Sequence, residues 1–167
     1  VSLLNGSTPG IHFPEDEYYI RRIRFAKSSE LVEILRQNGY TIEEDAYSPN
    51  TYCVEFPVHE PYFNKGKRDV SMWEQLEIAA QYQHYWADNS VSVTVSFKPS
   101  EGPQIKEALE MYETRLKAVS FLRYEETGYE QAPYEPITKE EYEKMNSKIT
   151  PFQRASINSA GSGTKFC

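Results

Sequence analysis

The order of hydrophobic and polar positions along the chain predicts short strands that alternate with helices. Four stretches have the two-residue alternation, or the β-branched and aromatic content, that is typical of strands; they cover residues 22–25, 51–56, 90–97 and 118–124. Four others repeat apolar residues at the helical period; they cover residues 30–37, 71–86, 102–116 and 139–148. This alternation predicts an α/β chain with right-handed crossovers and a parallel sheet.

Residues with known end preferences mark the limits of the predicted helices. Ser28 or Ser29 is a suitable N-cap for the first helix, and Asn38-Gly39 supplies the left-handed position at which helices end. Ser71 and Glu74 form a capping box at the start of the longest helix. The side chains expected to face the core are Leu31, Ile34 and Leu35 in the first helix, and Trp73, Leu76, Ala80 and Tyr85 in the longest one.

The clearest strand pattern, residues 90–97, places valines on one face and hydroxyl side chains on the other. We favour a solvated sheet for the hydroxyl face, with the lining of a barrel lumen or a ligand pocket as the alternative. Pro57 is expected to end the strand predicted over residues 51–56. Three or four strands without neighbours leave an exposed edge, which indicates that the chain is part of a larger sheet or barrel.

Composition narrows the classes of protein to consider. The chain has 167 residues, one domain's worth, with 39% hydrophobic and 26% charged residues, as in globular proteins. Its net charge of -7 and pI near 5.1 argue against a protein that coats nucleic acid. No apolar run is long enough for a membrane span, and two cysteines are too few for a disulfide framework, so a cytoplasmic location is expected. The start, Val1-Ser2-Leu3-Leu4, lacks a Met and a basic signal region, and we therefore expect a fragment.

Side chains with reactive chemistry are scattered along the sequence. His12, His59 and His84 lack the spacing of metal ligands, so structural or surface roles are expected and no metal site is predicted. The acidic run 15–17 is expected in a solvated loop. The turn-rich stretch 5–10 is either an ordinary turn or a set of backbone amides that face a phosphate. No complete catalytic motif accompanies these residues.

Several sequence runs, taken in order, resemble the C-terminal part of the monomeric, adenosylcobalamin-dependent (class II) ribonucleoside-triphosphate reductases. The likeness extends over residues 1–150, and six motifs in the same order are more specific than any one of them. The runs are Val1-Ser2-Leu3-Leu4, Gly10-Ile11-His12-Phe13, Ile20-Arg21-Arg22-Ile23-Arg24-Phe25, Asn50-Thr51-Tyr52-Cys53-Val54-Glu55-Phe56-Pro57, Tyr85-Trp86-Ala87-Asp88-Asn89-Ser90-Val91-Ser92, and Gln131-Ala132-Pro133 with Glu135-Pro136-Ile137.

The resemblance implies both a fold and a reaction. Enzymes of this family reduce ribonucleotides to 2′-deoxyribonucleotides, the precursors of DNA. Adenosylcobalamin generates a thiyl radical inside a ten-stranded α/β barrel, and the protein positions and shields that chemistry. A redox-active cysteine pair supplies the electrons, and cysteines of a flexible tail restore that pair by thiol–disulfide exchange. The expected fold class is therefore α/β, with residues 1–150 forming closing strand–helix units of such a barrel and residues 151–167 forming a flexible tail.

The resemblance assigns few functional residues to this chain. The radical cysteine and the active-site cysteines of the family lie upstream of Val1, so no catalytic residue is expected here, and Cys53 belongs to a strand, where it is expected to be buried. Val1 and Ser2 follow the family's phosphate-binding turn, and their amides are expected to face a substrate phosphate. Cys167 is either the first cysteine of the reducing tail or an incidental residue at a boundary.

We therefore expect a reductase segment that is inactive alone and works with adenosylcobalamin through the parent enzyme. The expected partners are a ribonucleotide substrate, a nucleotide effector, a thioredoxin-like reductant and the upstream part of the same enzyme, with no nucleic acid and no membrane. The alternative is a non-catalytic split subunit, or an assembly module that docks onto a barrel and completes it.

Overall fold

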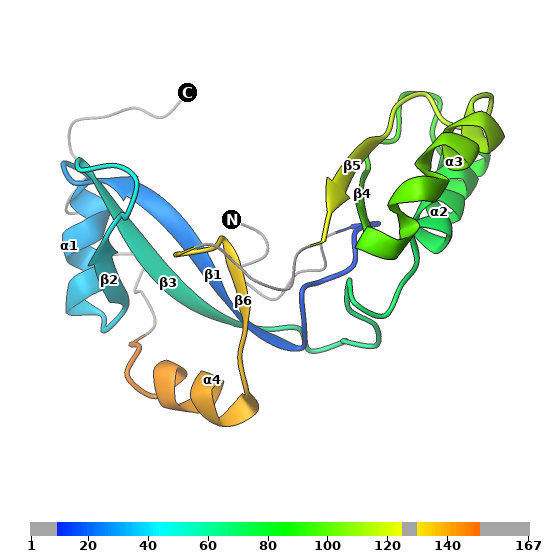
Figure 1. The fold of residues 1–167 in the computed structure, drawn as a ribbon. Helices are drawn as coiled ribbons and strands as arrows, with labels where there is room; N and C mark the ends of the chain where they lie inside the picture. The colour runs from blue at the N-terminus through cyan, green and yellow to red at the C-terminus, as the bar shows by residue number, and fades with distance from the viewer. Residues whose placement is uncertain (1–9, 125–129, 151–167) are drawn as a thin grey trace. The chain divides into compact units, whose positions relative to one another are not determined.

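A computed structural model describes residues 10–124 and 130–150 of the chain (Figure 1). The chain divides into two compact units. Residues 1–17 and 60–128 belong to the first unit, and residues 18–59 and 129–167 belong to the second. The second unit thus takes its residues from two separate stretches of the sequence.

The second unit is built on a four-stranded antiparallel sheet with the strand order β2-β3-β1-β6. Its longest pairing joins β1 to β3 over nine residues each, from Tyr18 opposite His59 to Ala26 opposite Thr51. Two helices, α1 and α4, complete the unit (Figure 1). The bounds of its elements are β1 Tyr18–Ala26, α1 Glu30–Gln37, β2 Thr41–Glu44, β3 Thr51–His59, β6 Tyr134–Pro136 and α4 Lys139–Asn146.

The prediction of a parallel sheet is wrong for this unit. The sequence pattern did not reveal β2, which has only four residues and one apolar side chain, Ile42. Because β1 and β2 both run antiparallel to β3, they run parallel to each other and lie on either side of it. The helical crossover therefore connects β1 to β2, and β3 then enters between them by way of a short turn.

Pro57 does not end β3, which continues to His59. Lys27 N donates to Asn50 O and Glu60 N donates to Glu17 O, and both bonds continue the β1–β3 register. Pairs with and without main-chain hydrogen bonds alternate along an antiparallel ladder, and the pair of Pro57 and Ile20 is one without them. The Pro57 nitrogen therefore faces away from β1. On that side β2 pairs only as far as Glu55, so the missing N–H breaks no ladder bond in the part of the sheet that the structure describes.

The predicted bounds of α1 are confirmed, but its predicted core face is partly wrong. Val32 and Leu35 are buried, whereas Leu31 is 44% exposed. The helix ends as predicted, because Gly39 has φ +84°, in the left-handed region. A Cβ atom at Gly39 would lie 2.1 Å from the main-chain oxygen of Lys148, so the position also requires the absence of a side chain.

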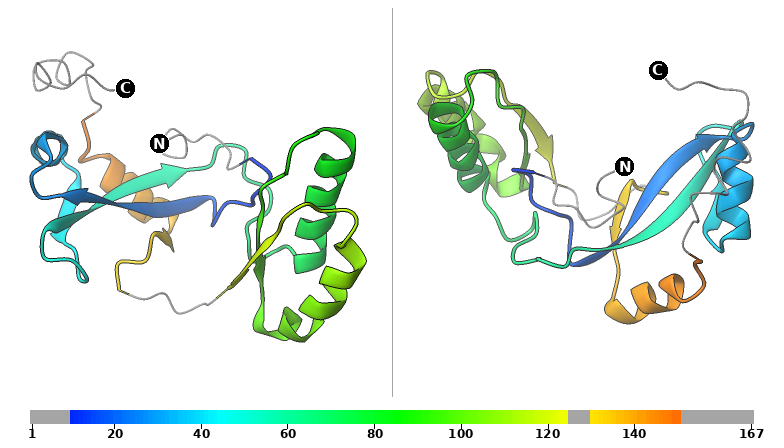
Figure 2. Two further views of the ribbon diagram at one scale, coloured as in Figure 1. Left: turned by 90° about the horizontal axis from the view of Figure 1, so that it is seen from above. Right: turned by 180° about the vertical axis from the view of Figure 1, so that it is seen from behind.

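The first unit contains the parallel pairing that the sequence predicted. β4 (Thr94–Phe97) pairs with β5 (Ser120–Arg123), and the connection passes through the 3-10 helix η2 (Pro99–Gln104) and α3 (Ile105–Tyr112). Helix α2 (Met72–Tyr85) precedes β4, and Ser71 caps it as predicted by accepting from Glu74 N at 3.1 Å. The predicted capping box is only half formed, because the Glu74 carboxylate accepts from Lys65 at 3.0 Å. Figures 1 and 2 show α2 and α3 on the same side of the strand pair. The core between these elements comprises Met72, Leu76, Ala79, Ala80, Val93, Val95, Ala108 and Tyr112.

Side chains occupy the edge of β4 that faces away from β5. Ser120 N donates to Val93 O, and Tyr124 N donates to Phe97 O, so the main-chain groups of Val93 and Phe97 face β5. Because successive residues of a strand alternate, the N–H and C=O groups of Thr94 and Ser96 face the opposite edge of β4. There the carboxamide of Gln75 accepts from Ser96 N at 2.9 Å and donates to Ser96 O at 2.7 Å. This side chain from α2 therefore forms the two hydrogen bonds that a neighbouring strand would form.

Among residues 10–124 and 130–150, no helix has both the length and the apolar composition needed to cross a lipid bilayer.

The Gly39→Ala substitution is expected to lower the free energy of unfolding by about 2 kcal/mol or more, because left-handed strain adds to the clash with Lys148. Urea unfolding measures this loss. Gly10→Ala is the matched control, since Gly10 has φ +71° but no atom within 4 Å of a built Cβ, and about 1 kcal/mol is expected for strain alone. Equal losses for the two variants would contradict the close approach at Gly39.

Candidate functional site

The site residues predicted from the sequence lie outside the described part of the chain. Val1 and Ser2, predicted to face a phosphate, and Cys167, predicted for the reducing tail, all fall beyond residues 10–124 and 130–150. Those assignments remain predictions. The other cysteine, Cys53, is only 1% exposed, and burial raises the pKa of its thiol. The prediction of a buried, apolar role for Cys53 is confirmed.

The segment that follows the predicted phosphate residues is held at the edge of β4. His12 Nε2 accepts a hydrogen bond from Thr94 N at 3.1 Å, so a neutral imidazole here carries its proton on Nδ1. Residues 10–14 also line a cavity of about 310 Å³, together with residues of the loop 60–65 and of α2. His12 therefore has a structural role on β4, as its isolation in the sequence predicted.

The acidic run 15–17 does not form a simple solvated loop. The Glu15 side chain is only 11% exposed; it forms an ion pair with Lys67 at 3.2 Å and accepts from the Tyr124 hydroxyl at 3.4 Å. Arg68 Nε donates to the same hydroxyl at 2.6 Å. The expectation of a solvated run is thus wrong for Glu15, because its partners are distant in the sequence and no local pattern reveals them.

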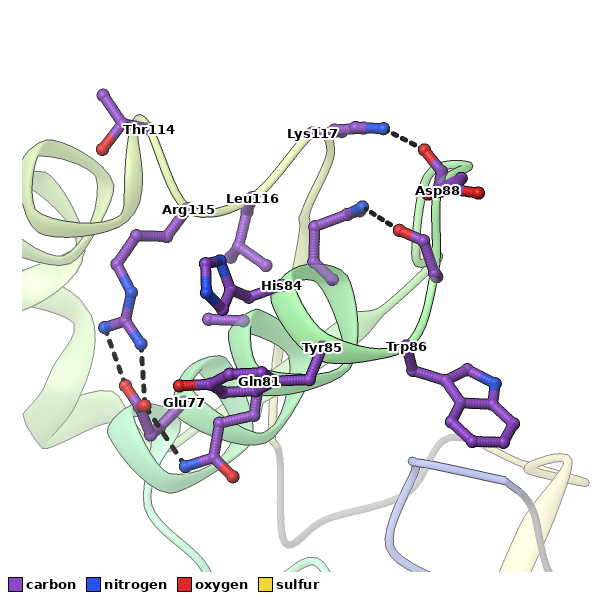
Figure 3. A pocket seen from close by; sticks show the side chains of 13 residues that line it. Glu77, Gln81, His84, Tyr85, Trp86, Asp88, Thr114, Arg115, Leu116 and Lys117 are labelled. Carbon is purple, nitrogen blue, oxygen red and sulfur yellow. Dashed lines mark hydrogen bonds and ion pairs between the residues drawn. The ribbon is translucent and has the colours of Figure 1, made fainter.

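A cavity at the C-terminal end of α2 has a volume of about 700 Å³ (Figure 3). One wall is the last turns of α2 and the turn that follows, residues 77–88, and the other is the segment 114–117 between α3 and β5. Figure 3 shows Arg115 directed toward Glu77 across this space, and Lys117 directed toward Asp88. Lys117 Nζ donates to the main-chain oxygen of Asp88.

The charged groups of this cavity satisfy one another. Arg115 donates to both carboxylate oxygens of Glu77, at 2.7 and 2.8 Å, and the Tyr112 hydroxyl donates to Glu77 at 3.0 Å. The bonds from Arg115 and then from Tyr112 lower the pKa of Glu77 from 4.5 to about 2. Burial, followed by the bond to Glu77, raises the pKa of Tyr112. The cluster therefore ties α2 to the end of α3 and leaves little net charge.

The turn after α2 is fixed by one glutamine side chain. Gln83 donates from Nε2 to Ala87 O at 2.9 Å and to Asn89 O at 3.0 Å, and its Oε1 accepts from Val91 N at 2.9 Å. Because the main chain of residues 87–91 is bound in this way, β4 begins at Thr94 and not at residue 90 as predicted. Nothing in the sequence pattern identifies Gln83 as the residue that holds this turn.

The histidines of the described residues take part in aromatic contacts. His59 stacks on Tyr18 with ring centroids 4.6 Å apart, and His84 meets Tyr85 edge-on at 4.5 Å. Across the described ranges, histidine, cysteine and carboxylate side chains do not gather in groups of three or more that hold a metal ion.

Comparison with solved structures defines the class of protein. The chain is similar to a crystal structure of a B-12 dependent (class II) ribonucleotide reductase, with a TM-score of 0.81 and 40% sequence identity. The similarity covers 98% of this chain and 23% of that one. No protein-family model matches the sequence.

Two curated relatives specify the relationship further. The adenosylcobalamin-dependent ribonucleoside-triphosphate reductase of Euglena gracilis is 47% identical over 89% of this chain and 21% of its own length. A probable enzyme of the same name from Dictyostelium discoideum is 42% identical over 100% of this chain and 23% of its own length. The chain is thus homologous, over nearly all of its length, to a segment of the adenosylcobalamin-dependent class II ribonucleotide reductases. It spans about a fifth of the length of these relatives, and the family resemblance seen in the sequence is confirmed.

Glu77→Gln is expected to remove a pH dependence of stability. Because the folded-state pKa of Glu77 is lowered to about 2, the carboxylate stabilises the protein above pH 4.5, and that contribution is lost as the pH falls toward 2. Denaturant unfolding at a series of pH values measures the difference between the protein and the variant. The difference is expected to shrink between pH 4.5 and 2, and a difference that stays constant over that window would contradict the Arg115 and Tyr112 contacts.

Proposed function

We propose that this chain is a segment of an adenosylcobalamin-dependent ribonucleotide reductase that converts ribonucleotides to 2′-deoxyribonucleotides. The observation that carries the proposal is the identity of 40–47% to proteins of that name and class, extended over 89% or more of the chain. The TM-score of 0.81 supports it independently of sequence motifs. By itself the segment is inactive, since the described residues lack a catalytic set.

In this proposal the segment contributes closing strand–helix units of a ten-stranded α/β barrel. The unit β4-α3-β5 has the required form, since two parallel strands are joined through a helix. Val1 and Ser2 face a substrate phosphate, and Cys167 belongs to the reducing tail that exchanges disulfides with a thioredoxin-like reductant. A nucleotide effector and the remaining part of the enzyme complete the set of partners.

The residues described here do not fit a cobalamin site. Two cavities of the first unit have volumes of about 700 and 310 Å³; at the first His84 meets the Tyr85 ring edge-on, and at the second His12 accepts from Thr94 N. Adenosylcobalamin therefore binds through the remaining part of the enzyme, and this segment supports the barrel around it.

A chimeric enzyme tests the proposal directly. The homologous segment of the Euglena gracilis reductase is replaced by this chain, and deoxyribonucleotide formation is measured with adenosylcobalamin and a dithiol. The chimera is expected to form product, whereas the 167-residue chain alone is expected to form none. A chimera that folds and binds adenosylcobalamin but makes no deoxyribonucleotide would favour the alternative, a non-catalytic assembly module. Product from the chain alone would also contradict the proposal.

Cys167→Ser in the parent enzyme is expected to lower turnover with one reductant and to leave turnover with another unchanged. Turnover supported by thioredoxin falls about tenfold or more, because the tail thiol that attacks the active-site disulfide is lost, while turnover supported by a small dithiol is retained. Cys53→Ala is the matched control, since Cys53 is buried and the ratio of the two turnovers stays unchanged. Unchanged thioredoxin-supported turnover in Cys167→Ser would make Cys167 an incidental residue.

A further inference from the structure

Two large aromatic side chains are exposed next to each other at the end of α2. Tyr85 is 81% exposed and Trp86 is 85% exposed, although the sequence pattern predicted Tyr85 for the core. Figure 3 shows that the two side chains leave the end of the helix in different directions, and both residues line the cavity there. Aromatic side chains bury a large area when they are covered, and adjacent exposed ones are typical of a contact surface.

The main chain presents these aromatic side chains in a fixed position. Trp86 N donates to Tyr82 O at 3.1 Å, and Ala87 N donates to the same oxygen at 2.9 Å. Gln83 holds the main chain of the following turn through Ala87, Asn89 and Val91. The exposure of Trp86 therefore comes from an ordered turn, and little conformational entropy is lost when a partner covers it.

The neighbouring cavity selects a partner of low charge. Its walls carry two acidic side chains, Glu77 and Asp88, and two basic ones, Arg115 and Lys117, so their charges balance. Glu77 is bound by Arg115, and Lys117 is bound to Asp88 O. Within the described ranges, each buried side-chain nitrogen or oxygen has a hydrogen-bond partner. An apolar polypeptide surface fits the exposed aromatic rings of Tyr85 and Trp86.

We propose that Tyr85, Trp86 and the cavity beside them are the surface on which the remaining part of the reductase chain packs, through an apolar segment. This inference rests on the proposed function. The choice of occupant follows from the length of the relatives. The chain spans only 21% and 23% of their lengths, so most of such an enzyme lies outside these residues. In the complete enzyme Trp86 is a buried contact residue, as its aromatic area and fixed position favour.

Hydroxyl-radical footprinting of the Euglena chimera tests this surface in a full-length enzyme. Side-chain oxidation is read by mass spectrometry, and the rate for each residue is compared with its rate in the urea-unfolded chimera. Trp73 is the internal reference for a protected side chain. Its ring packs against the core of the first unit, and its Nε1 donates to Gln104 at 2.7 Å. Trp86 is expected to be protected to about the same degree as Trp73, about tenfold or more relative to the unfolded chain.

The outcomes separate the possible occupants of the surface. Protection of Trp86 that is independent of protein concentration supports packing within one chain. Protection that disappears on dilution would show that a second copy covers the surface, and oxidation of Trp86 at the unfolded rate would show that nothing does; either result overturns the inference. Deoxyribonucleotide formation by the same chimera is measured in parallel. An active chimera with unprotected Trp86 refutes only the contact surface, whereas an inactive chimera with protected Trp86 refutes only the proposed function.

Discussion

The parallel pairing of β4 with β5 is the constraint on which the first unit depends. The two strands have four residues each, and parallel strands need a crossover connection, which η2 and α3 supply. Helices α2 and α3 bury one face of the pair through the core around Leu76 and Val95. Parallel sheets are usually covered on both faces, and two strands are rarely stable alone. Leu122 of β5 is nevertheless 58% exposed. These features favour the proposal that the unit belongs to a larger sheet, and the chain is homologous to a segment of longer enzymes.

Side-chain amides hold the parts of this unit that strand pairing does not. Gln75 forms two hydrogen bonds to Ser96, and Gln83, two helical turns later, binds the turn before β4. His12 binds Thr94 N from a different segment of the same unit. Each of these groups satisfies main-chain donors or acceptors that would otherwise be costly to leave unpaired. The result is a short strand whose position is set from both edges, by β5 on one side and by side chains on the other.

Local sequence signals predicted most helix starts and the sheets only in part. The bounds of α1, the start of α2 after Ser71 and the start of α4 at Lys139 were correct, because capping residues and helical periodicity are local. The helix predicted over residues 102–116 is shorter, because α3 covers Ile105–Tyr112 and residues 102–104 belong to η2. The pairing of β4 with β5 was correct as well. The antiparallel sheet was missed because β2 carries a single apolar residue, and the Glu15–Lys67 ion pair was missed because its members lie 52 positions apart. Tyr85 was assigned to the core by periodicity, yet it lies in the last turn of α2 and is 81% exposed. The family could be recognised from the ordered motifs, whereas the cavity at the end of α2 could not.

Residue-resolved hydrogen exchange in the intact reductase tests the central claim, that this segment is part of a larger parallel sheet. By the alternation of the ladder, the Leu122 N–H points toward β4 and the Phe121 N–H points toward the opposite edge of β5. If the sheet continues beyond β5, the Phe121 amide is protected to the same degree as the Leu122 amide. If Phe121 exchanges at the rate of an unprotected amide while Leu122 remains protected, the sheet ends at β5 and the account is contradicted.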